Sequence, residues 1–203
     1  MQLNFSTLSA AERYHLMTQT IIPRPIAWVL TASNEKTEQD NYNLAPFSYF
    51  TGICSEPPLL MISITKKPDG QLKDTLINAL KNKKMVIHIP SEKQAALVTQ
   101  TAAPLLHGES EIKDCALTTT TLGDFELPRL VECDVAYGCE LYETKEIGDA
   151  PQTLIFAEIK TIYINEQVLN TEKPERIDIK ANKVKPLARL GGGQYTGITP
   201  PFK

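Results

Sequence analysis

Short apolar runs recur along the chain and are separated by polar turns. Residues 26–31 (IAWVLT), 59–64 and 85–89 are dominated by apolar and β-branched residues, which favours strands, and 59–64 reads as buried on both faces. Longer segments at 129–142 and 153–164 alternate between apolar and polar residues for much of their length, as strands of an antiparallel sheet do. The pattern therefore predicts a chain in which strands dominate.

Prolines divide the region that follows the first strand. Residues 32–42 are polar and turn-like, so a hairpin tip is expected there. Residues 43–50 are predicted to return as a strand, and Pro46 within them indicates a sheet edge or a bulge. The pair Pro57-Pro58 then breaks the chain before the strand at 59–64.

Helices are few in this pattern. Ser9 and Glu12 form a capping box, so a short helix is expected to begin there. Apolar residues at helical spacing predict a second helix within 73–84, and another box at 91–94 caps a third over 92–102. Because helices do not alternate regularly with strands, the prediction is a mainly β fold, an antiparallel barrel with peripheral helices.

The composition fits a single globular domain over residues 1–203. Hydrophobic residues make up 42% of the chain and charged residues 22%, with a net charge of −3. We therefore expect no general affinity for nucleic acid or for anionic membranes. No apolar run reaches the roughly 18 residues of a membrane span. The four cysteines form no C-x-x-C pair and the N-terminus lacks a secretory leader, so free thiols and a cytoplasmic location are expected.

Familiar catalytic motifs are absent. The sequence contains no G-x-G-x-x-G, no phosphate-binding P-loop and no G-x-S-x-G. The three histidines are widely separated and no Ser or Cys has an evident base, so we predict neither a metal site nor a catalytic residue. His88, within an apolar strand, is expected in the core or on a dimer surface. His107, in a polar turn after a helix, is a candidate ligand contact.

Residues 43–64 have the features of a ligand surface. Their prolines hold backbone that has no ladder partner, and its N–H and C=O groups need partners. Lys73, Asp74 and Thr75 follow at a predicted helix start, which suits a phosphate. Aromatic area, polar backbone and a phosphate cradle fit flavin mononucleotide (FMN), with a ligand-free barrel corner as the alternative. The side chains of the segment that offer hydrogen bonds or stacking area are Asn43, Phe47, Ser48, Tyr49, Phe50 and Thr51.

Several motifs in order resemble those of the flavin reductase-like, FMN-binding split-barrel family. The combination is more specific than any one motif, and the resemblance runs from about residue 15 to 195, the expected core of the domain. The motifs are IPRPIAWVLT at 22–31, NLAPFSYF at 43–50, PPL at 57–59 with Ser63, KDTLIN at 73–78 and PLARLGG at 186–192.

The resemblance implies a six-stranded Greek-key split barrel and a homodimer with one FMN per subunit at the interface. It implies that the phosphate lies near Lys73, Asp74 and Thr75, and that the flavin ring edge meets backbone of residues 45–50, with Ser48 donating a hydrogen bond. The full set of residues expected at the cofactor is Arg24, Thr31, Asn43, Ala45, Pro46, Phe47, Ser48, Tyr49, Phe50, Ser63, Lys73, Asp74, Thr75 and His107.

The expected activity is hydride transfer from NAD(P)H to FMN, after which the reduced flavin passes electrons to a small-molecule or protein acceptor. This step needs no acid–base group of the protein, which agrees with the absence of a catalytic dyad. A flavoredoxin-like electron carrier, reduced by a protein partner instead of NAD(P)H, is the main alternative. A non-enzymatic barrel that binds FMN or haem is a third.

Overall fold

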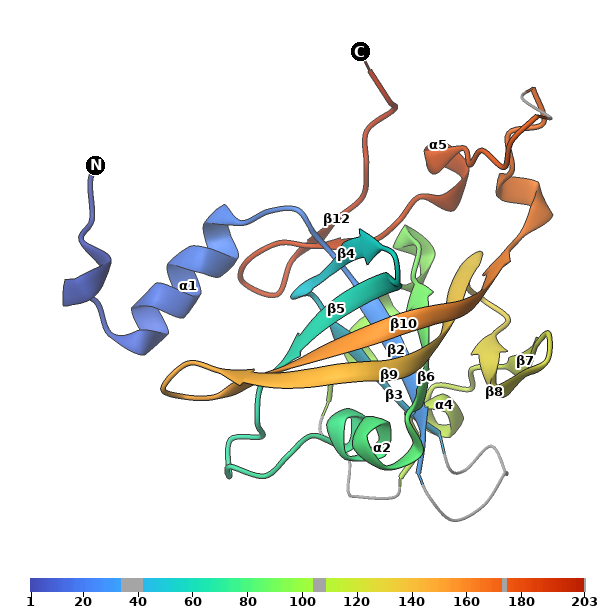
Figure 1. Ribbon diagram of the computed structural model, residues 1–203. Helices are drawn as coiled ribbons and strands as arrows, with labels where there is room; N and C mark the ends of the chain where they lie inside the picture. Colours follow the sequence, from blue (N-terminus) through green and yellow to red (C-terminus); the bar gives the residue numbers. More distant parts are fainter. Residues whose placement is uncertain (34–41, 104–108, 173–174, 203) are drawn as a thin grey trace.

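The computed structural model describes residues 1–33, 42–103, 109–172 and 175–202. Its centre is a seven-stranded sheet with the order β3-β2-β6-β9-β10-β5-β4 (Figure 1). Every neighbouring pair in this sheet is antiparallel, so the predicted mainly β, antiparallel class is confirmed. The strands are β2 (Ala27–Ala32), β3 (Tyr42–Phe47), β4 (Phe50–Ser55), β5 (Pro58–Ile64), β6 (Lys84–Ile89), β9 (Val135–Ile147) and β10 (Gln152–Ile164).

Smaller elements surround this sheet. One small sheet contains β1 (Arg24–Pro25), β11 (Ala188–Arg189) and β12 (Tyr195–Thr196), and a hairpin contains β7 (Thr119–Leu122) and β8 (Phe125–Leu130). The helices are α1 (Ala10–Thr20), α2 (Asp74–Asn82), α3 (Ala95–Gln100), α4 (Glu111–Asp114) and α5 (Ala181–Val184), with 3-10 turns η1 (Phe5–Thr7), η3 (Glu92–Gln94) and η4 (Glu166–Val168). Both predicted capping boxes are present, at the starts of α1 and η3.

The link between β3 and β4 closes the sheet into a barrel. These two strands lie at opposite edges of the sheet, yet only Ser48 and Tyr49 separate them in sequence. A link of two residues can join the edges only if the sheet curls until they meet. The Tyr49 carbonyl then accepts a hydrogen bond from the Ser63 amide of β5, at 2.9 Å.

Two predictions about individual strands were wrong. The main sheet has seven strands rather than six, because residues 43–50 do not form one strand: β3 ends at Phe47, and a separate strand runs over 50–55. The segment 129–142 is not one strand either, since β8 ends at Leu130 and β9 begins at Val135. Pro46 does lie on an edge strand, as expected, because β3 has a neighbour on one side only.

The core has two main clusters that share β2 and β6. Alternate residues of β2, such as Val29, point into the barrel with Ile87 and with Leu76 of α2. The intervening residues, such as Trp28 and Leu30, pack on the other face against α3, α4 and the β7–β8 hairpin. Central strands that are covered on both faces explain why their sequences are apolar almost throughout.

His88 lies in this core and joins three strands. Its Nδ1–H donates to the Trp28 carbonyl at 3.0 Å, and its Nε2 accepts from the Leu130 amide at 2.9 Å. The ring is therefore held as one neutral tautomer. Burial lowers the pKa of His88 to about 4, and the nearby Arg129 charge also lowers it. This places His88 in the core, one of the two positions expected for it.

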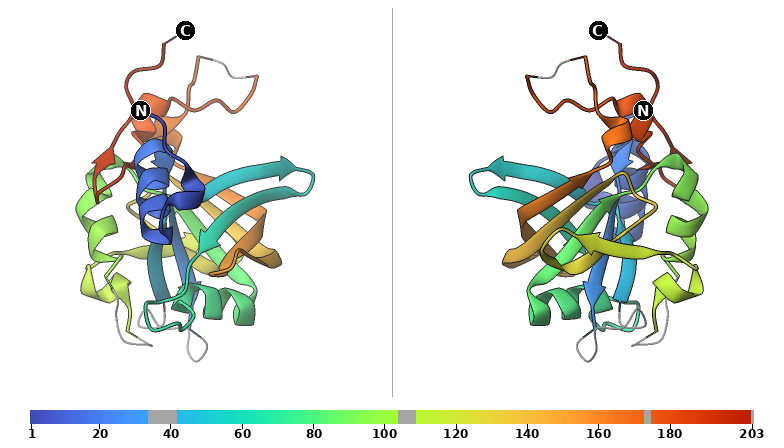
Figure 2. Two further views of the ribbon diagram at one scale, coloured as in Figure 1. Left: turned by 90° about the vertical axis from the view of Figure 1, so that its left-hand side faces the viewer. Right: turned by 90° about the vertical axis from the view of Figure 1, so that its right-hand side faces the viewer.

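Two elements stand away from the barrel. Helix α1 has no buried residue, and Figure 1 shows it beside the barrel rather than on it. Figure 2 shows the β4–β5 ribbon projecting from the body, and residues 51–56 along it are exposed. Within the described residues, no helix combines the length and the apolar character needed to cross a bilayer.

Candidate functional site

A cavity of about 570 Å³ lies where α1 faces the link that closes the barrel. This volume is in the range of cofactor and small-molecule sites. One wall is the α1 face, and the opposite wall includes the end of β3 and its link to β4. The lining residues are Ala10, Arg13, Tyr14, Met17, Thr18, Pro46, Phe47, Ser48, Tyr49, Ser63, Thr65, Lys73 and Gln152.

Lys73 supplies a positive charge at this cavity. It immediately precedes α2, and its ammonium lies 5.6 Å from the centroid of the Phe47 ring. Burial lowers the pKa of Lys73, and the charge of Lys67 lowers it further. No described carboxylate forms an ion pair with Lys73, whereas Lys67 is paired with Asp74 at 3.0 Å. A bound anion would relieve this partly desolvated charge.

The first turn of α2 adds backbone donors near Lys73. The amides of Leu76 and Ile77 both donate to the Lys73 carbonyl, at 2.9 and 3.1 Å. The amides of Asp74 and Thr75 have no acceptor inside the helix. A helix N-terminus beside a lysine is a favourable place for a phosphate.

Ser48 is oriented by Arg24. The Arg24 Nε lies 3.4 Å from the Ser48 hydroxyl and donates to it. The rest of the guanidinium donates to the carbonyls of Thr18, Ile21 and Leu190, at 2.7, 2.8 and 3.1 Å. Arg24 thus ties the end of α1 to the C-terminal segment. Because Ser48 accepts from Arg24, its own hydroxyl proton is available for an acceptor in the cavity.

The Tyr49 hydroxyl is buried and has no hydrogen-bond partner among the described residues. Burial raises the pKa of Tyr49, and the neighbouring Tyr14 raises it further. The hydroxyl therefore stays protonated at neutral pH. A buried hydroxyl without a partner is uncommon in folded proteins, and Tyr49 lines the cavity. It could donate to a ligand held there.

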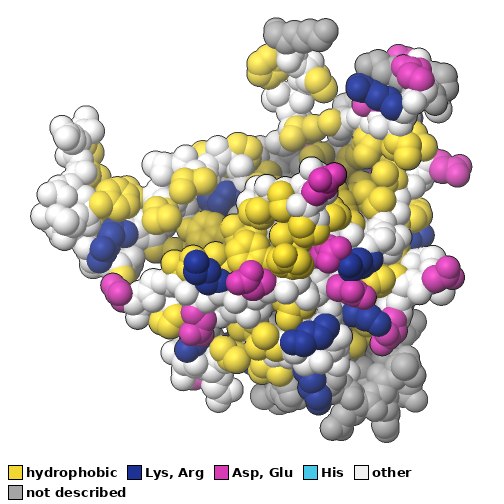
Figure 3. Space-filling model, viewed as in Figure 1, with side chains coloured by type: hydrophobic (Ala, Val, Ile, Leu, Met, Phe, Trp, Pro, Cys, Tyr) yellow, Lys and Arg dark blue, Asp and Glu magenta, His cyan; other side chains and the backbone are white. Residues whose placement is uncertain are grey.

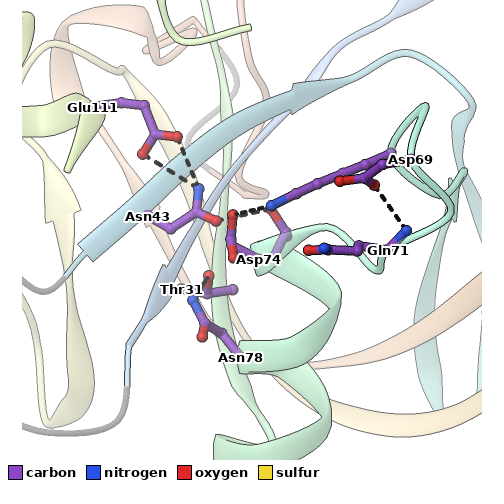
Figure 4. Close-up of polar contacts among 9 residues, drawn as sticks. Thr31, Asn43, Asp69, Gln71, Asp74, Asn78 and Glu111 are labelled. Carbon is purple, nitrogen blue, oxygen red and sulfur yellow. Dashed lines mark hydrogen bonds and ion pairs between the residues drawn. The ribbon is translucent and has the colours of Figure 1, made fainter. Parts of the chain in front are cut away.

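Five other polar side chains, which we call the interior network, form two hydrogen-bonded groups. Asn43, Glu111 and Thr75 make the first group, and Thr31 with Asn78 makes the second. Figure 4 shows Asn43 directed at Glu111 and Asn78 beside Thr31. The Asn43 amide lies 3.3 Å from both Glu111 oxygens, and its oxygen accepts from Thr75 at 3.4 Å. One Glu111 oxygen also accepts from the Leu44 amide at 2.8 Å.

The interior network is buried and paired with itself. Asn78 donates to the Thr31 hydroxyl at 3.2 Å, and all five side chains are buried. Burial raises the pKa of Glu111, although the bonds from Leu44 and Asn43 act against this. Three residues expected at the cofactor, Thr31, Asn43 and Thr75, thus lie in this network and not among those lining the cavity.

The remaining predicted residues are divided. Pro46, Phe47 and Ser63 line the cavity. Ala45 and Phe50 pack against the barrel core. Asp74 lines a neighbouring hollow with Lys66 and Lys67. His107 lies outside the described residues.

A smaller cavity of about 180 Å³ adjoins the first, because Tyr14, Pro46, Phe47 and Ser48 line both. Its other lining residues lie in or next to β1, in or just after α3, and in the C-terminal segment, and they are Arg24, Ile26, Val98, Ala102, Arg189 and Tyr195. The two cavities meet at the β3–β4 link, so a ligand in one is next to a ligand in the other.

Sequence reasoning missed the contribution of α1. Arg13, Tyr14 and Met17 of this helix line the large cavity, and Tyr14 is 62% exposed and Met17 40% exposed. The capping box located the helix, but nothing local showed what it would face. The available signal was the spacing of Tyr14 and Met17 at i and i+3, which places both side chains on one face of the helix. Gln152, at the start of β10, also lines the cavity, and no feature of the sequence indicated this.

The chain matches a known protein family over most of its length. A family model described as a flavin reductase like domain matches residues 17–187. A relative from Aquifex aeolicus, described only as an uncharacterised protein, is 33% identical over 182 residues, which are 90% of this chain and 88% of that protein.

Two solved structures are similar over the whole chain. Nitrilotriacetate monooxygenase component B from Bacillus cereus is 30% identical with a TM-score of 0.89, covering 100% of this chain and 98% of that one. The 2-nitrobenzoate 2-nitroreductase from Pseudomonas fluorescens is 26% identical with a TM-score of 0.86, covering 100% and 94%. The shared architecture is the split barrel expected from the sequence.

Proposed function

Because the chain belongs to the flavin reductase-like family, we propose that it binds FMN in the 570 Å³ cavity and acts as an NAD(P)H-dependent flavin oxidoreductase. The observation that carries this proposal is the environment of Lys73. Its partly desolvated ammonium has no carboxylate partner among the described residues and stands at the start of α2. The phosphate of FMN supplies the missing anion at that place.

The rest of the cavity suits a flat ring with polar edges. Phe47 and Tyr14 supply aromatic area, and Ser48 and Tyr49 supply hydroxyl donors that are free of described acceptors. We propose that the backbone of residues 45–50 and the Ser48 hydroxyl meet the ring edge. Thr31, Asn43 and Thr75 are paired within the interior network, so for them we propose an indirect role, holding β3 and α2 in place.

The protein residues in this proposal bind and orient; none transfers a proton. Bound FMN would supply the redox chemistry, namely hydride transfer from NAD(P)H and the passage of electrons to an acceptor. Lys73 and the first turn of α2 hold the phosphate end. Arg24 holds Ser48 through the bond to its hydroxyl, and α1 covers the cavity on the side away from the barrel.

The same proposal includes a homodimer of single-domain subunits. Helix α1 has no buried residue in a single subunit. Its apolar side chains Tyr14 and Met17 are exposed, as is Ile21 just after the helix, so this surface lacks the apolar contacts that a second subunit could supply. Apolar side chains also gather over β5 and β10 (Figure 3), where the cross-strand pair Met61 and Phe156 is partly exposed. A second subunit covering these surfaces would enclose the cavity, and FMN would then lie at the interface.

The electron acceptor is proposed from chemistry and similarity. The similar Bacillus cereus protein is named as a component of a monooxygenase, which favours a partner protein or a small molecule as acceptor here. All four cysteines are free thiols. This agrees with the proposal that the protein acts in the cytoplasm, where thiols stay reduced.

Two observations on the purified protein test the proposal. Its visible spectrum should show bound flavin, and a haem band in its place would contradict the FMN site. Under anaerobic conditions, NADH or NADPH should then bleach the flavin absorbance. If the flavin is bound but neither nucleotide bleaches it, the reductase proposal fails and a carrier reduced by a protein partner takes its place.

A further inference from the structure

The smaller cavity of about 180 Å³ contains an arginine whose charge has no partner in the protein. Arg189 of β11 lines this cavity and is half-buried. Its guanidinium forms no hydrogen bond or ion pair with any described residue. It lies 4.6 Å from the centroid of the Tyr195 ring, and the Tyr195 hydroxyl is 3.1 Å from the Thr99 hydroxyl. The charge is thus held in place by stacking but not neutralised.

Arg24 provides an internal comparison. Arg24 and Arg189 are directly opposite each other in the β1–β11 pair, and both line the smaller cavity. Arg24 makes four hydrogen bonds, three of them to backbone carbonyls. A guanidinium whose donors are occupied in this way serves the fold. Arg189 keeps its five N–H donors available to the cavity.

The charges around the two cavities also do not balance. Arg13 and Lys73 line the large cavity, Arg24 and Arg189 line the small one, and neither lining includes an Asp or Glu. The FMN phosphate, placed at Lys73, lies in the large cavity. The charge of Arg189 in the small cavity therefore calls for a second anion.

We propose that the smaller cavity is the subsite of the second substrate, and that Arg189 binds an oxyanion of that substrate. The shared chemistry is a phosphate or a carboxylate, either of which pairs with a guanidinium through two parallel hydrogen bonds. A nicotinamide dinucleotide supplies the first and an organic acid acceptor the second. This inference rests on the proposed function, because it places the second substrate beside FMN.

The test uses the FMN-loaded protein and the variant Arg189→Gln. Arg176→Gln is the matched control, since Arg176 is exposed, pairs with Asp178 and lines neither cavity. Arg189→Gln should fold normally, because its side chain bonds to no described residue, and thermal unfolding checks this. Arg189→Lys keeps the charge without the planar fork and should fall between wild type and Arg189→Gln.

Binding at equilibrium is the first readout and needs no turnover. Calorimetric titrations with NAD⁺, NADP⁺ and benzoate should show affinities that fall about 10- to 100-fold in Arg189→Gln, the scale of a charge-assisted hydrogen bond. A loss confined to the nucleotides identifies the phosphate as the anion, and a loss confined to benzoate identifies the carboxylate. Unchanged affinities in Arg189→Gln, or no binding of these probes by wild type, would overturn the proposal.

Anaerobic stopped-flow reduction is the second readout. If the binding data identify the phosphate as the anion, Arg189→Gln should raise the half-saturating concentration of NADH or NADPH and leave the limiting rate nearly unchanged; if they identify the carboxylate, the same shift should appear with the organic acid acceptor instead. With 1-benzyl-1,4-dihydronicotinamide, a hydride donor without phosphates, wild type and variant should react alike. An equal loss with this donor would show a damaged flavin environment and contradict the proposal. A wild type that binds no FMN refutes the proposed function itself, which is a distinct outcome.

Discussion

The interior network and the lining of the large cavity contain similar polar side chains, but these side chains differ in whether they have hydrogen-bond partners within the protein. In the network, Asn43 and Glu111 find partners within the protein. In the cavity, Lys73, Ser48 and Tyr49 each keep a donor that no described residue accepts. Because buried polar groups are nearly always paired in folded proteins, we propose that this difference separates groups that hold the fold from groups that bind a ligand.

The largest expected effect is on protein stability and comes from a substitution in the interior network. Glu111→Ala removes the acceptor for the Leu44 amide and the Asn43 side chain. Two buried donors without acceptors should lower the free energy of unfolding by about 2–5 kcal/mol. Urea unfolding at neutral pH measures this. The control is Glu126→Ala, whose exposed carboxylate pairs with Lys84 and whose loss should change stability by less than about 1 kcal/mol. Equal effects of the two substitutions would argue against the network.

A second prediction concerns His88, another buried polar group with both partners inside the fold. Its pKa in the folded state is about 4, below the unperturbed value of 6.5. As the pH falls from 6.5 to 4, the unfolded chain gains a proton at this residue and the folded chain does not. His88 should therefore remove about 3 kcal/mol of stability across that window, and its contribution is fully present above pH 6.5.

Two measurements check the His88 prediction. Comparing urea unfolding of wild type with His88→Gln isolates this contribution from that of the carboxylates, and His15→Gln, on the exposed α1, is the control. NMR titration of the imidazole should give a midpoint near 4. A midpoint near the unperturbed value of about 6.5 would mean that the ring is not held neutral as described.

On the ligand side, Lys73→Ala should weaken FMN binding by about 1.5–3 kcal/mol, the scale of a hydrogen bond to a charged group. The free energy of unfolding of Lys73→Ala should be close to that of wild type, because Lys73 has no described ion-pair partner. Quenching of flavin fluorescence measures the affinity. Lys81→Ala, on the last turn of the same helix, should leave the affinity unchanged. If both variants bind FMN like wild type, Lys73 is only a solvated lysine.

The smallest effect is expected at Ser48. Ser48→Ala removes one neutral hydroxyl donor from the cavity and should weaken FMN binding by about 1 kcal/mol. The exposed Ser55 of β4 provides the control variant Ser55→Ala. An unchanged affinity in Ser48→Ala would indicate that only peptide groups of residues 45–50 meet the ring.

Local sequence signals predicted the elements but not all of their limits. The capping box at Ser9 and the apolar pattern of 153–164 located α1 and β10 closely. The strand at 50–55 was missed because its exposed residues lack the alternation that packing imposes. The break between β8 and β9 was missed because residues 131–134 (VECD) continue the alternation of apolar and polar residues.

The sequence could not show which of the residues expected at the cofactor line the cavity and which pair with each other in the interior. Asn43 and Ser48 stand in one motif and carry similar chemistry, yet Asn43 points to Glu111 and Ser48 lines the cavity. That distinction depends on α4, which is distant in sequence and pairs with Asn43 only after folding. The contribution of α1 to the cavity likewise depends on tertiary packing, through the bonds from Arg24 to the end of that helix.

The most direct test of the central claim compares FMN with riboflavin, which has the same ring but no phosphate. Wild type should bind FMN more tightly than riboflavin by at least the factor, about 10- to 100-fold, that Lys73→Ala loses toward FMN. Lys73→Ala should keep only the smaller preference for FMN that the first turn of α2 supplies. Equal binding of the two flavins by wild type would contradict the claim that Lys73 awaits the phosphate of FMN.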